Sequence, residues 1–144
     1  MERIEDCISF LCGKAAQAVA RVTRERLAPH GVTPAQYAVL QVLWERDGQS
    51  GAKLGSRLVL DSATMTGVLD RLEKQGLIRR SAAAGDRRVH LISLTEAGRA
   101  QRAPLQAVMD AINADLVRQL GADADGLGPL LRRLAAVTGQ AKEP

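Results

Sequence analysis

Aromatic residues are scarce in this chain, and hydrophobic residues never form a long run. Phe, Tyr and Trp account for 2% of its 144 residues, whereas 46% are hydrophobic, so aliphatic side chains must fill the core. That composition favours packed helices over a β-sandwich. No segment approaches the roughly 18 apolar residues of a membrane span, and the N-terminal MERIED lacks the features of a secretory signal. We therefore expect one mostly helical, soluble domain in the cytoplasm, with no membrane partner.

Signatures of catalysis and of metal binding are also missing. The two cysteines, Cys7 and Cys12, are too few for a disulfide framework and lack the two-residue gap of a zinc pair. His30 and His90 stand apart from any other candidate ligand or base. There is no Gly-rich phosphate loop and no nucleophile elbow. The sequence therefore predicts a protein that is not an enzyme and that holds neither a metal nor a cofactor.

Positive charge is concentrated in the middle of the chain. Residues 50–95 hold eight Lys or Arg against four acids, so this segment carries the whole net charge of +4. A basic centre between balanced flanks is typical of a nucleic-acid surface. A solvated charged face would give the same composition, so charge alone leaves both interpretations open.

Helical periodicity dominates the first half of the sequence. Apolar residues from Ile4 onward recur every three or four positions, which indicates a first helix that Pro29 and Gly31 end. A second helix follows in TPAQYAVLQVLWER, where Thr33 is the expected N-cap and Gln36 completes a capping box.

The third and fourth predicted helices form a helix-turn-helix. After a loop at 47–51, AKLGSRLVL indicates a short helix that stops near Val59. Asp61 caps the next helix, which Gly76 ends. Two short helices joined by a tight turn are typical of this motif. The residues expected to be buried on the second and fourth helices are Tyr37, Leu40, Leu43, Trp44, Met65, Val68, Leu69 and Leu72.

Two β-type runs, 77–81 and 87–94, predict an antiparallel hairpin with a rather long loop over 82–86. An isolated hairpin is marginal in water, so this one needs support from the helices. Thr95 then caps a helix that Pro104 kinks or restarts, and a break over 121–129 precedes a last helix. The predicted fold class is mostly α with a small antiparallel β-hairpin wing, a winged helix-turn-helix.

The fourth helix and the hairpin each offer a surface suited to DNA. Small and hydroxylic residues face away from the apolar stripe of the helix, so its backbone can approach a major groove closely. The hairpin carries Arg87 and Arg88 at its tip, where guanidinium groups can enter a minor groove of negative potential. Asp86 could hold the Arg88 fork through a bidentate pair. A solvent-facing helix side and a plain charged turn are the alternatives.

The central segment resembles the MarR family of bacterial transcriptional regulators, named for multiple antibiotic resistance. The matching segments are APHGVTPAQYAVLQVLWE, LVLDSATMTGVLDRLEKQGLIRR and GDRRVHLISLTEAGR. The resemblance implies a homodimer held by N- and C-terminal dimerisation helices, at 1–32 and 96–144, around a DNA-binding lobe at 33–95. Each lobe would read half of a pseudo-palindromic operator, with half-sites roughly 10 base pairs apart. The residues that the resemblance places at or near DNA are Ser62, Ala63, Thr64, Thr66, Gly67, Arg71, Asp86, Arg87 and Arg88.

The resemblance also implies a small-molecule effector. Regulators of this kind usually repress a neighbouring operon and release DNA when a phenolic or other aromatic carboxylate binds between the dimerisation helices and the DNA-binding lobe. Lys14, Arg21, Arg24 and Arg26 form a basic cluster that would suit the phosphates of an acyl-CoA thioester, although a solvated helix face fits as well. The residues expected to line the pocket are Ile8, Leu11, Cys12, Arg21, Arg24, Tyr37 and Trp44.

Two other functions fit parts of the sequence. One branch of the family senses organic hydroperoxides through a cysteine on the first helix, a role open to Cys7 or Cys12, but Ser9 occupies the matching position. The two cysteines point about 140° apart on a helix, so they cannot bridge within one chain. The second alternative is a winged-helix protein-interaction module that binds no DNA.

Overall fold

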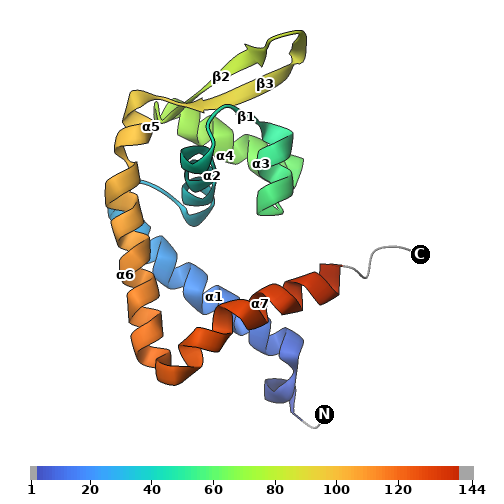
Figure 1. Cartoon of the computed structure of the whole chain (residues 1–144), viewed down its shortest axis with the longest axis vertical. Helices are drawn as coiled ribbons and strands as arrows, with labels where there is room; N and C mark the ends of the chain where they lie inside the picture. The colour runs from blue at the N-terminus through green and yellow to red at the C-terminus, as the bar shows by residue number, and fades with distance from the viewer. Residues whose placement is uncertain (1–2, 140–144) are drawn as a thin grey trace, which may run out of the picture. The chain divides into compact units, whose positions relative to one another are not determined.

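The computed structural model describes residues 3–139, and most of them are helical, as the sequence predicts (Figure 1). The chain divides into two compact units, one up to Val108 and one from Met109. No helix within residues 3–139 is both long and apolar enough to cross a membrane. The elements in chain order are η1 (Ile4–Asp6), α1 (Ile8–Leu27), η2 (Ala28–His30), α2 (Pro34–Glu45), β1 (Gln49–Ser50), α3 (Gly51–Leu58), α4 (Ser62–Lys74), β2 (Ile78–Ala83), β3 (Asp86–Leu94), α5 (Glu96–Ala100), α6 (Arg102–Leu120), η3 (Gly121–Asp123) and α7 (Ala124–Gly139).

The predicted helix starts in the centre of the chain are confirmed. The Thr33 hydroxyl accepts from the backbone N–H of Gln36, and the Gln36 side chain accepts from the backbone N–H of Thr33 at 2.8 Å. Asp61 caps α4 in the same way, through Thr64. The first helix begins later than predicted, because Cys7 is extended and separates the short turn η1 from α1. Apolar spacing continues across this break and therefore does not reveal it.

The hairpin differs from the prediction at its turn and gains a third strand. Strands β2 and β3 pair antiparallel as far as Ala83 with Asp86, so the turn is Ala84–Gly85 and the long loop predicted over 82–86 is wrong. Gly85 has φ +89°, which lets the chain reverse within two residues. The segment predicted as a loop at 47–51 contributes β1, which pairs with β3 to give the order β1-β3-β2.

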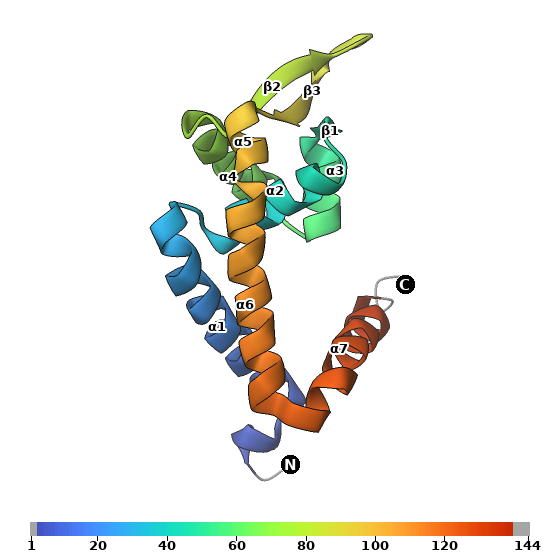
Figure 2. The same cartoon turned by 60° about the vertical axis from the view of Figure 1, so that its left-hand side comes forward.

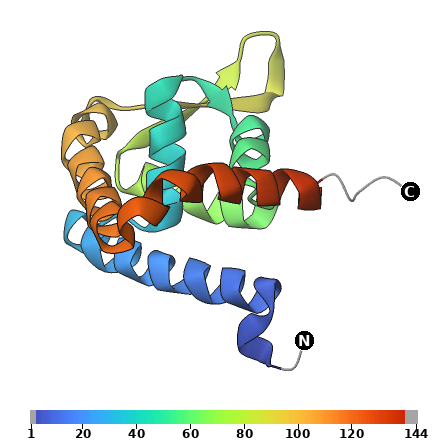
Figure 3. The same cartoon turned by 60° about the horizontal axis from the view of Figure 1, so that its bottom comes forward.

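Helices α2, α3 and α4 carry the core of the first unit. Leu40, Leu43 and Trp44 are buried as predicted, whereas Tyr37 is only half-buried. The predicted stripe of α4 is buried along its whole length. The β2–β3 hairpin projects away from these three helices, as the two turned views also show (Figures 2 and 3). The largest fully buried side chains are Leu27, Val39, Leu40, Leu43, Leu54, Leu72, Ile78, Ile92 and Leu105.

The short helix α5 fits closely against the start of β2. The buried indole N–H of Trp44 donates to the Gly98 carbonyl at 3.0 Å. A Cβ atom at Gly98 would lie 2.0 Å from the Leu77 carbonyl oxygen, so no larger residue fits at this position without movement. Thr95 caps α5 and also donates its hydroxyl to the Gly76 carbonyl at 2.6 Å.

One carboxylate joins three segments at the base of the hairpin. Asp47 Oδ1 accepts from the backbone N–H groups of Gly48 and Leu94, each at 2.9 Å. The other oxygen, Oδ2, accepts from the Arg99 guanidinium of α5 at 2.8 Å. The loop after α2, the end of β3 and the helix α5 are therefore held at a single point.

The helices after the hairpin confirm one prediction and correct another. Pro104 marks a restart, because α5 ends at Ala100 and α6 begins at Arg102. The break predicted over 121–129 is too long, since α7 begins at Ala124 and contains Pro129. A proline inside a helix removes one N–H donor and crowds the carbonyl four residues earlier, which can kink the helix without ending it.

Candidate nucleic-acid interface

The outer face of α4 is the first part of the candidate interface. Its predicted contact residues Ser62, Ala63, Thr64, Thr66 and Arg71 are exposed, and Gly67 is half-buried. A Cβ at Gly67 would lie 3.6 Å from Nη2 of Arg71, so the guanidinium lies close to this glycine. The face therefore combines a low, small-residue surface with one long cation, which suits close approach to a groove.

The two threonine hydroxyls on this face are already hydrogen-bonded to α4 or its cap. Thr64 donates to Asp61 Oδ2 at 3.0 Å, and Thr66 donates to the Ser62 carbonyl at 2.9 Å. Each hydroxyl oxygen keeps acceptor capacity toward a base or a bound water. The hydrogen bonds from the backbone and side chain of Thr64 lower the pKa of Asp61, so this cap carries a negative charge at neutral pH.

The wing is the second part of the interface. Asp86, Arg87 and Arg88 are exposed and follow the Ala84–Gly85 turn directly. Asp86 Oδ1 accepts from the backbone N–H of Arg88 at 2.9 Å, so the expected bidentate pair with the Arg88 guanidinium is not formed. A short acidic side chain beside a turn readily bonds the N–H two residues onward. The Arg88 guanidinium is therefore not held by Asp86.

Cations of the basic central segment fall into two groups. Arg57 pairs with Glu45 of α2, and Arg80 pairs with Asp70 and Glu73 of α4. Within residues 3–139, no ion pair holds the remaining six, which are Lys53, Arg71, Lys74, Arg79, Arg87 and Arg88. The sequence alone does not separate the two groups, because pairing between different helices and strands has no local signal.

An open groove of about 680 Å³ lies between α4, the start of α3 and the wing. Thr66 and Asp70 of α4 line one wall, and Arg80, Arg88 and His90 of the hairpin line another. Of the predicted contact residues, the groove brings together Thr66 of α4 and Arg88 of the wing. Among the described residues no three His, Cys, Asp or Glu side chains converge as metal ligands would.

The predicted effector-pocket residues are not gathered in one place. Ile8, Leu11 and Cys12 are exposed at the start of α1. Arg21 and Arg24 are exposed near its end, about 20 Å further along a helix that rises about 1.5 Å per residue. A small pocket within one chain cannot include both ends of α1.

The two aromatic residues expected in the pocket have different surroundings. Trp44 is buried and bound to Gly98, so its N–H is not available to a ligand. Tyr37 packs edge-on against it, with ring centroids 6.0 Å apart and planes at 69°. Its hydroxyl donates to Gln41 Oε1 at 3.2 Å.

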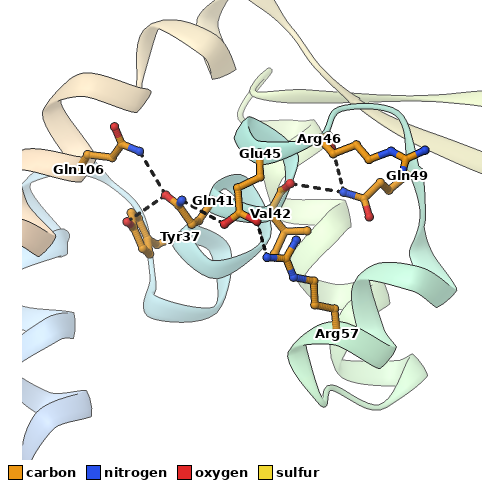
Figure 4. A network of polar contacts seen from close by, with 8 residues as sticks. All are labelled: Tyr37, Gln41, Val42, Glu45, Arg46, Gln49, Arg57 and Gln106. Atoms are coloured by element: carbon orange, nitrogen blue, oxygen red, sulfur yellow. Dashed lines mark hydrogen bonds and ion pairs between the residues drawn. The ribbon is translucent and has the colours of Figure 1, made fainter. Parts of the chain in front are cut away.

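Sequence reasoning missed a polar network along α2 (Figure 4). Gln41 also accepts from Gln106 of α6 at 3.4 Å and donates to Glu45 at 3.3 Å. Glu45 in turn pairs with Arg57 of α3. The hydrogen bonds from Arg57 and then Gln41 lower the pKa of Glu45. The network links α6, α2 and α3 through neutral amides and one ion pair.

Known proteins with this arrangement regulate transcription. The sequence model described as MarR family matches residues 32–90. The HTH-type transcriptional regulator TtmR of Methylorubrum extorquens (strain PA1) is 38% identical over 136 residues, which cover 94% of this chain and 68% of that protein. The crystal structure of a probable transcriptional regulator from Pseudomonas aeruginosa is 37% identical with a TM-score of 0.85, over 92% of this chain and 99% of that one.

Two further similar structures, both named CouR, each contain a bound partner. The transcriptional repressor CouR bound to a 23-mer DNA duplex is 29% identical with a TM-score of 0.84, over 96% of both chains. CouR from Rhodococcus jostii RHA1 bound to p-coumaroyl-CoA is 27% identical with a TM-score of 0.82, over 95% of both chains. Together with the exposed α4 face and the arginine-bearing wing, these matches show that the chain belongs to the MarR family of DNA-binding transcriptional regulators.

Proposed function

We propose that this regulator is a repressor that binds a pseudo-palindromic operator as a homodimer and releases it when a small effector binds. In this proposal α4 enters the major groove and the β2–β3 wing reaches the adjacent minor groove. The observation that carries it is the groove that places the small-residue face of α4 opposite Arg88 of the wing, with the exposed Arg87 next to Arg88 in the chain.

The wing is tested by the double variant Arg87→Ala, Arg88→Ala. A dimer loses four guanidinium groups, and each neutralised phosphate adds about 0.9 to the slope of log affinity against log salt. We expect weaker binding to the regulator's own promoter region and a slope reduced by up to about 3.6. Fluorescence anisotropy at several salt concentrations measures both quantities.

The matched control is Arg132→Ala, Arg133→Ala, which removes two adjacent arginines from α7. This control changes net charge equally, so it should keep the wild-type slope while the protein remains dimeric. Equal binding by wild type and the wing variant would contradict the wing contact. If the chain is instead a protein-interaction module, it should show no DNA affinity that falls steeply with salt.

The proposed homodimer is supported by apolar side chains exposed at both ends of the chain. Large exposed apolar groups in series mark association surfaces. In the second unit they include Leu130 and Leu131 of α7, at 59% and 54% exposure. We expect Leu130→Lys, Leu131→Lys to shift the mass measured by light scattering from dimer to monomer and to abolish operator binding. A dimer of unchanged stability would exclude α7 from the interface. The other large apolar residues exposed on the terminal helices are Ile4, Ile8, Phe10, Leu11, Val19, Val117, Leu120, Leu127 and Val137.

The proposed effector is an aromatic or phenolic carboxylate or its acyl-CoA thioester. CouR binds p-coumaroyl-CoA, and Arg21 and Arg24 are exposed on α1 of this chain, where they could meet CoA phosphates. An effector shifts binding only by its difference in affinity between the DNA-competent and DNA-incompetent forms. Ile8 and Arg21 lie about 20 Å apart along one helix, so a ligand that contacts both must be long, as an acyl-CoA thioester is.

The effector proposal is tested by titrating the operator complex with p-coumaric acid, p-coumaroyl-CoA and CoA. Release by the acid alone would favour the carboxylate, and release by the thioester would favour the acyl-CoA ligand. In the second case Arg21→Ala, Arg24→Ala should weaken the response without changing operator affinity. If none of the three compounds releases the operator, this effector class is excluded, whereas the proposed DNA binding is unaffected.

Peroxide sensing is a second candidate function, because Cys12 is exposed and Cys7 is half-buried at the start of α1. An exposed thiol is accessible to a hydroperoxide. The variant Cys7→Ser, Cys12→Ser tests this role. If cumene hydroperoxide releases wild type from DNA but not the variant, the regulator senses peroxide. If neither protein responds, the thiols have no such function.

A further inference from the structure

Arg80 of β2 makes three hydrogen bonds to two acids of α4. Its Nη2 donates to Asp70 Oδ1 at 2.6 Å, and its Nη1 donates to Glu73 Oε2 at 2.9 Å. The backbone N–H of Arg80 also donates to Glu73 Oε1 at 3.2 Å. Asp70 and Glu73 lie one turn apart on α4, so the planar fork of the guanidinium spans both carboxylates. We call these three residues the Arg80 clamp.

The clamp lies where the hairpin departs from the helix. Only Gln75, Gly76 and Leu77 separate α4 from β2, and Gly76 has φ +72°, a conformation that glycine adopts freely. The Arg80 side chain is 26% exposed, whereas Asp70 is 59% and Glu73 is 40% exposed. Arg80 is therefore the more enclosed partner, and its bonds are better protected from water than those of an ordinary surface pair.

We infer that Arg80 is a positioning residue that sets the angle between the wing and α4, so that both reach their grooves in one approach. This inference rests on the proposed function, in which α4 and the wing contact the same half-site. A two-stranded hairpin alone is marginally stable. Holding it before binding reduces the entropy lost when it docks on DNA.

The two acids would otherwise be unfavourable at their location. Asp70 lines the groove between α4 and the wing together with Thr66 and Arg88, and negative charge there repels phosphate. If the acids acted only through charge, removing one would strengthen DNA binding. If they hold Arg80 in place, removing one weakens DNA binding, so the two explanations predict opposite signs.

The test measures operator affinity of Glu73→Gln, of Arg80→Ala, of the double variant Asp70→Asn, Glu73→Gln, and of the triple variant that also carries Arg80→Ala. We expect Glu73→Gln and Arg80→Ala each to weaken binding about fivefold or more. Adding Arg80→Ala to Asp70→Asn, Glu73→Gln should cause little further loss, because the clamp is already absent. The control Arg79→Ala removes the neighbouring exposed arginine of the same strand; it makes no contact with these acids, so its effect should be additive on either background.

Hydroxyl-radical footprinting separates positioning from folding. Loss of the clamp should remove hydroxyl-radical protection at the minor-groove flank of each half-site, while major-groove protection of guanine N7 from dimethyl sulfate is kept. Circular dichroism should show an unchanged helix content. Tighter or unchanged binding by Glu73→Gln overturns the inference, as does a full additive loss from Arg80→Ala on the acid-free background. If wild type does not bind its promoter region, or the Arg87→Ala, Arg88→Ala variant binds normally, the proposed function has failed instead.

Discussion

Replacing Gly98 by alanine tests the packing of α5 in a way that separates two opposing effects. Gly98 lies within α5, where alanine ordinarily stabilises a helix by about 0.5–1 kcal/mol relative to glycine. Here the new Cβ would stand 2.0 Å from the Leu77 carbonyl oxygen and 3.0 Å from its carbonyl carbon. Both are backbone atoms, so the helix and the strand start must move apart by about 1 Å or more.

That movement disturbs two hydrogen bonds. The Leu77 carbonyl accepts from the Thr95 N–H at 3.1 Å, and the Gly98 carbonyl accepts from Trp44 at 3.0 Å. Forced overpacking costs about 1–3 kcal/mol, and a buried donor left unpaired costs about 1–3 kcal/mol. After subtracting the helix-propensity gain, we expect Gly98→Ala to lower the free energy of unfolding by about 1–5 kcal/mol. For a chain of this length that lowers the melting temperature by about 3–17 °C.

Thermal unfolding followed by circular dichroism measures the effect, at one protein concentration because a dimer's stability depends on it. Gly67→Ala is the matched control, since it lies within α4 and its Cβ would meet only the flexible end of Arg71 at 3.6 Å. The control should be as stable as wild type or slightly more stable. If Gly98→Ala melts with the control, α5 does not pack against Leu77 as described, and the reasoning is refuted.

Two further predictions concern the helix-turn-helix. The pKa of Asp61 is lowered in the folded protein by bonds from Thr64, so its stabilisation is present above its unfolded pKa of about 3.9 and is lost as pH falls through the lower folded value. Asp61→Asn keeps the capping oxygen but cannot titrate, so its melting temperature should fall less than that of wild type between pH 5 and acid; parallel curves would contradict the cap. Val59 lies between α3 and α4 with φ +54°, and its side chain is 89% exposed. Val59→Gly should therefore raise the free energy of unfolding, measured by urea titration, by about 0.5–1 kcal/mol. A loss of stability would show that this backbone conformation is not strained.

The parts of the fold that the sequence predicts are those with local causes. Thr33 and Asp61 each accept a hydrogen bond from a backbone N–H three residues onward. The cap and the start of the helix are therefore predictable from a short stretch of sequence. The buried stripe of α4 follows from its apolar spacing in the same way. Residues of α4 outside this stripe face away from the core, so the predicted exposure of Ser62 and Thr66 is confirmed.

The parts that the sequence does not predict depend on residues far apart in the chain. Strand β1 exists only because Gln49 and Ser50 find the edge of β3. Arg80 looks like one more cation until the hairpin brings it to the acids of α4. From sequence alone, Gly98 only weakens a helix. The structure shows why glycine is needed there: the Leu77 carbonyl oxygen leaves no room for a Cβ atom.

The three hydrogen bonds to Asp47 make the base of the wing rigid. A single carboxylate holds the loop after α2, the last residue of β3 and the Arg99 side chain of α5. A hinge bends where few contacts must break. Bending at this junction would break hydrogen bonds to Asp47. Rotation of α5 would therefore carry the strand end and the loop with it. In the proposed repressor, an effector that moves α5 would change the position of the wing base as a unit.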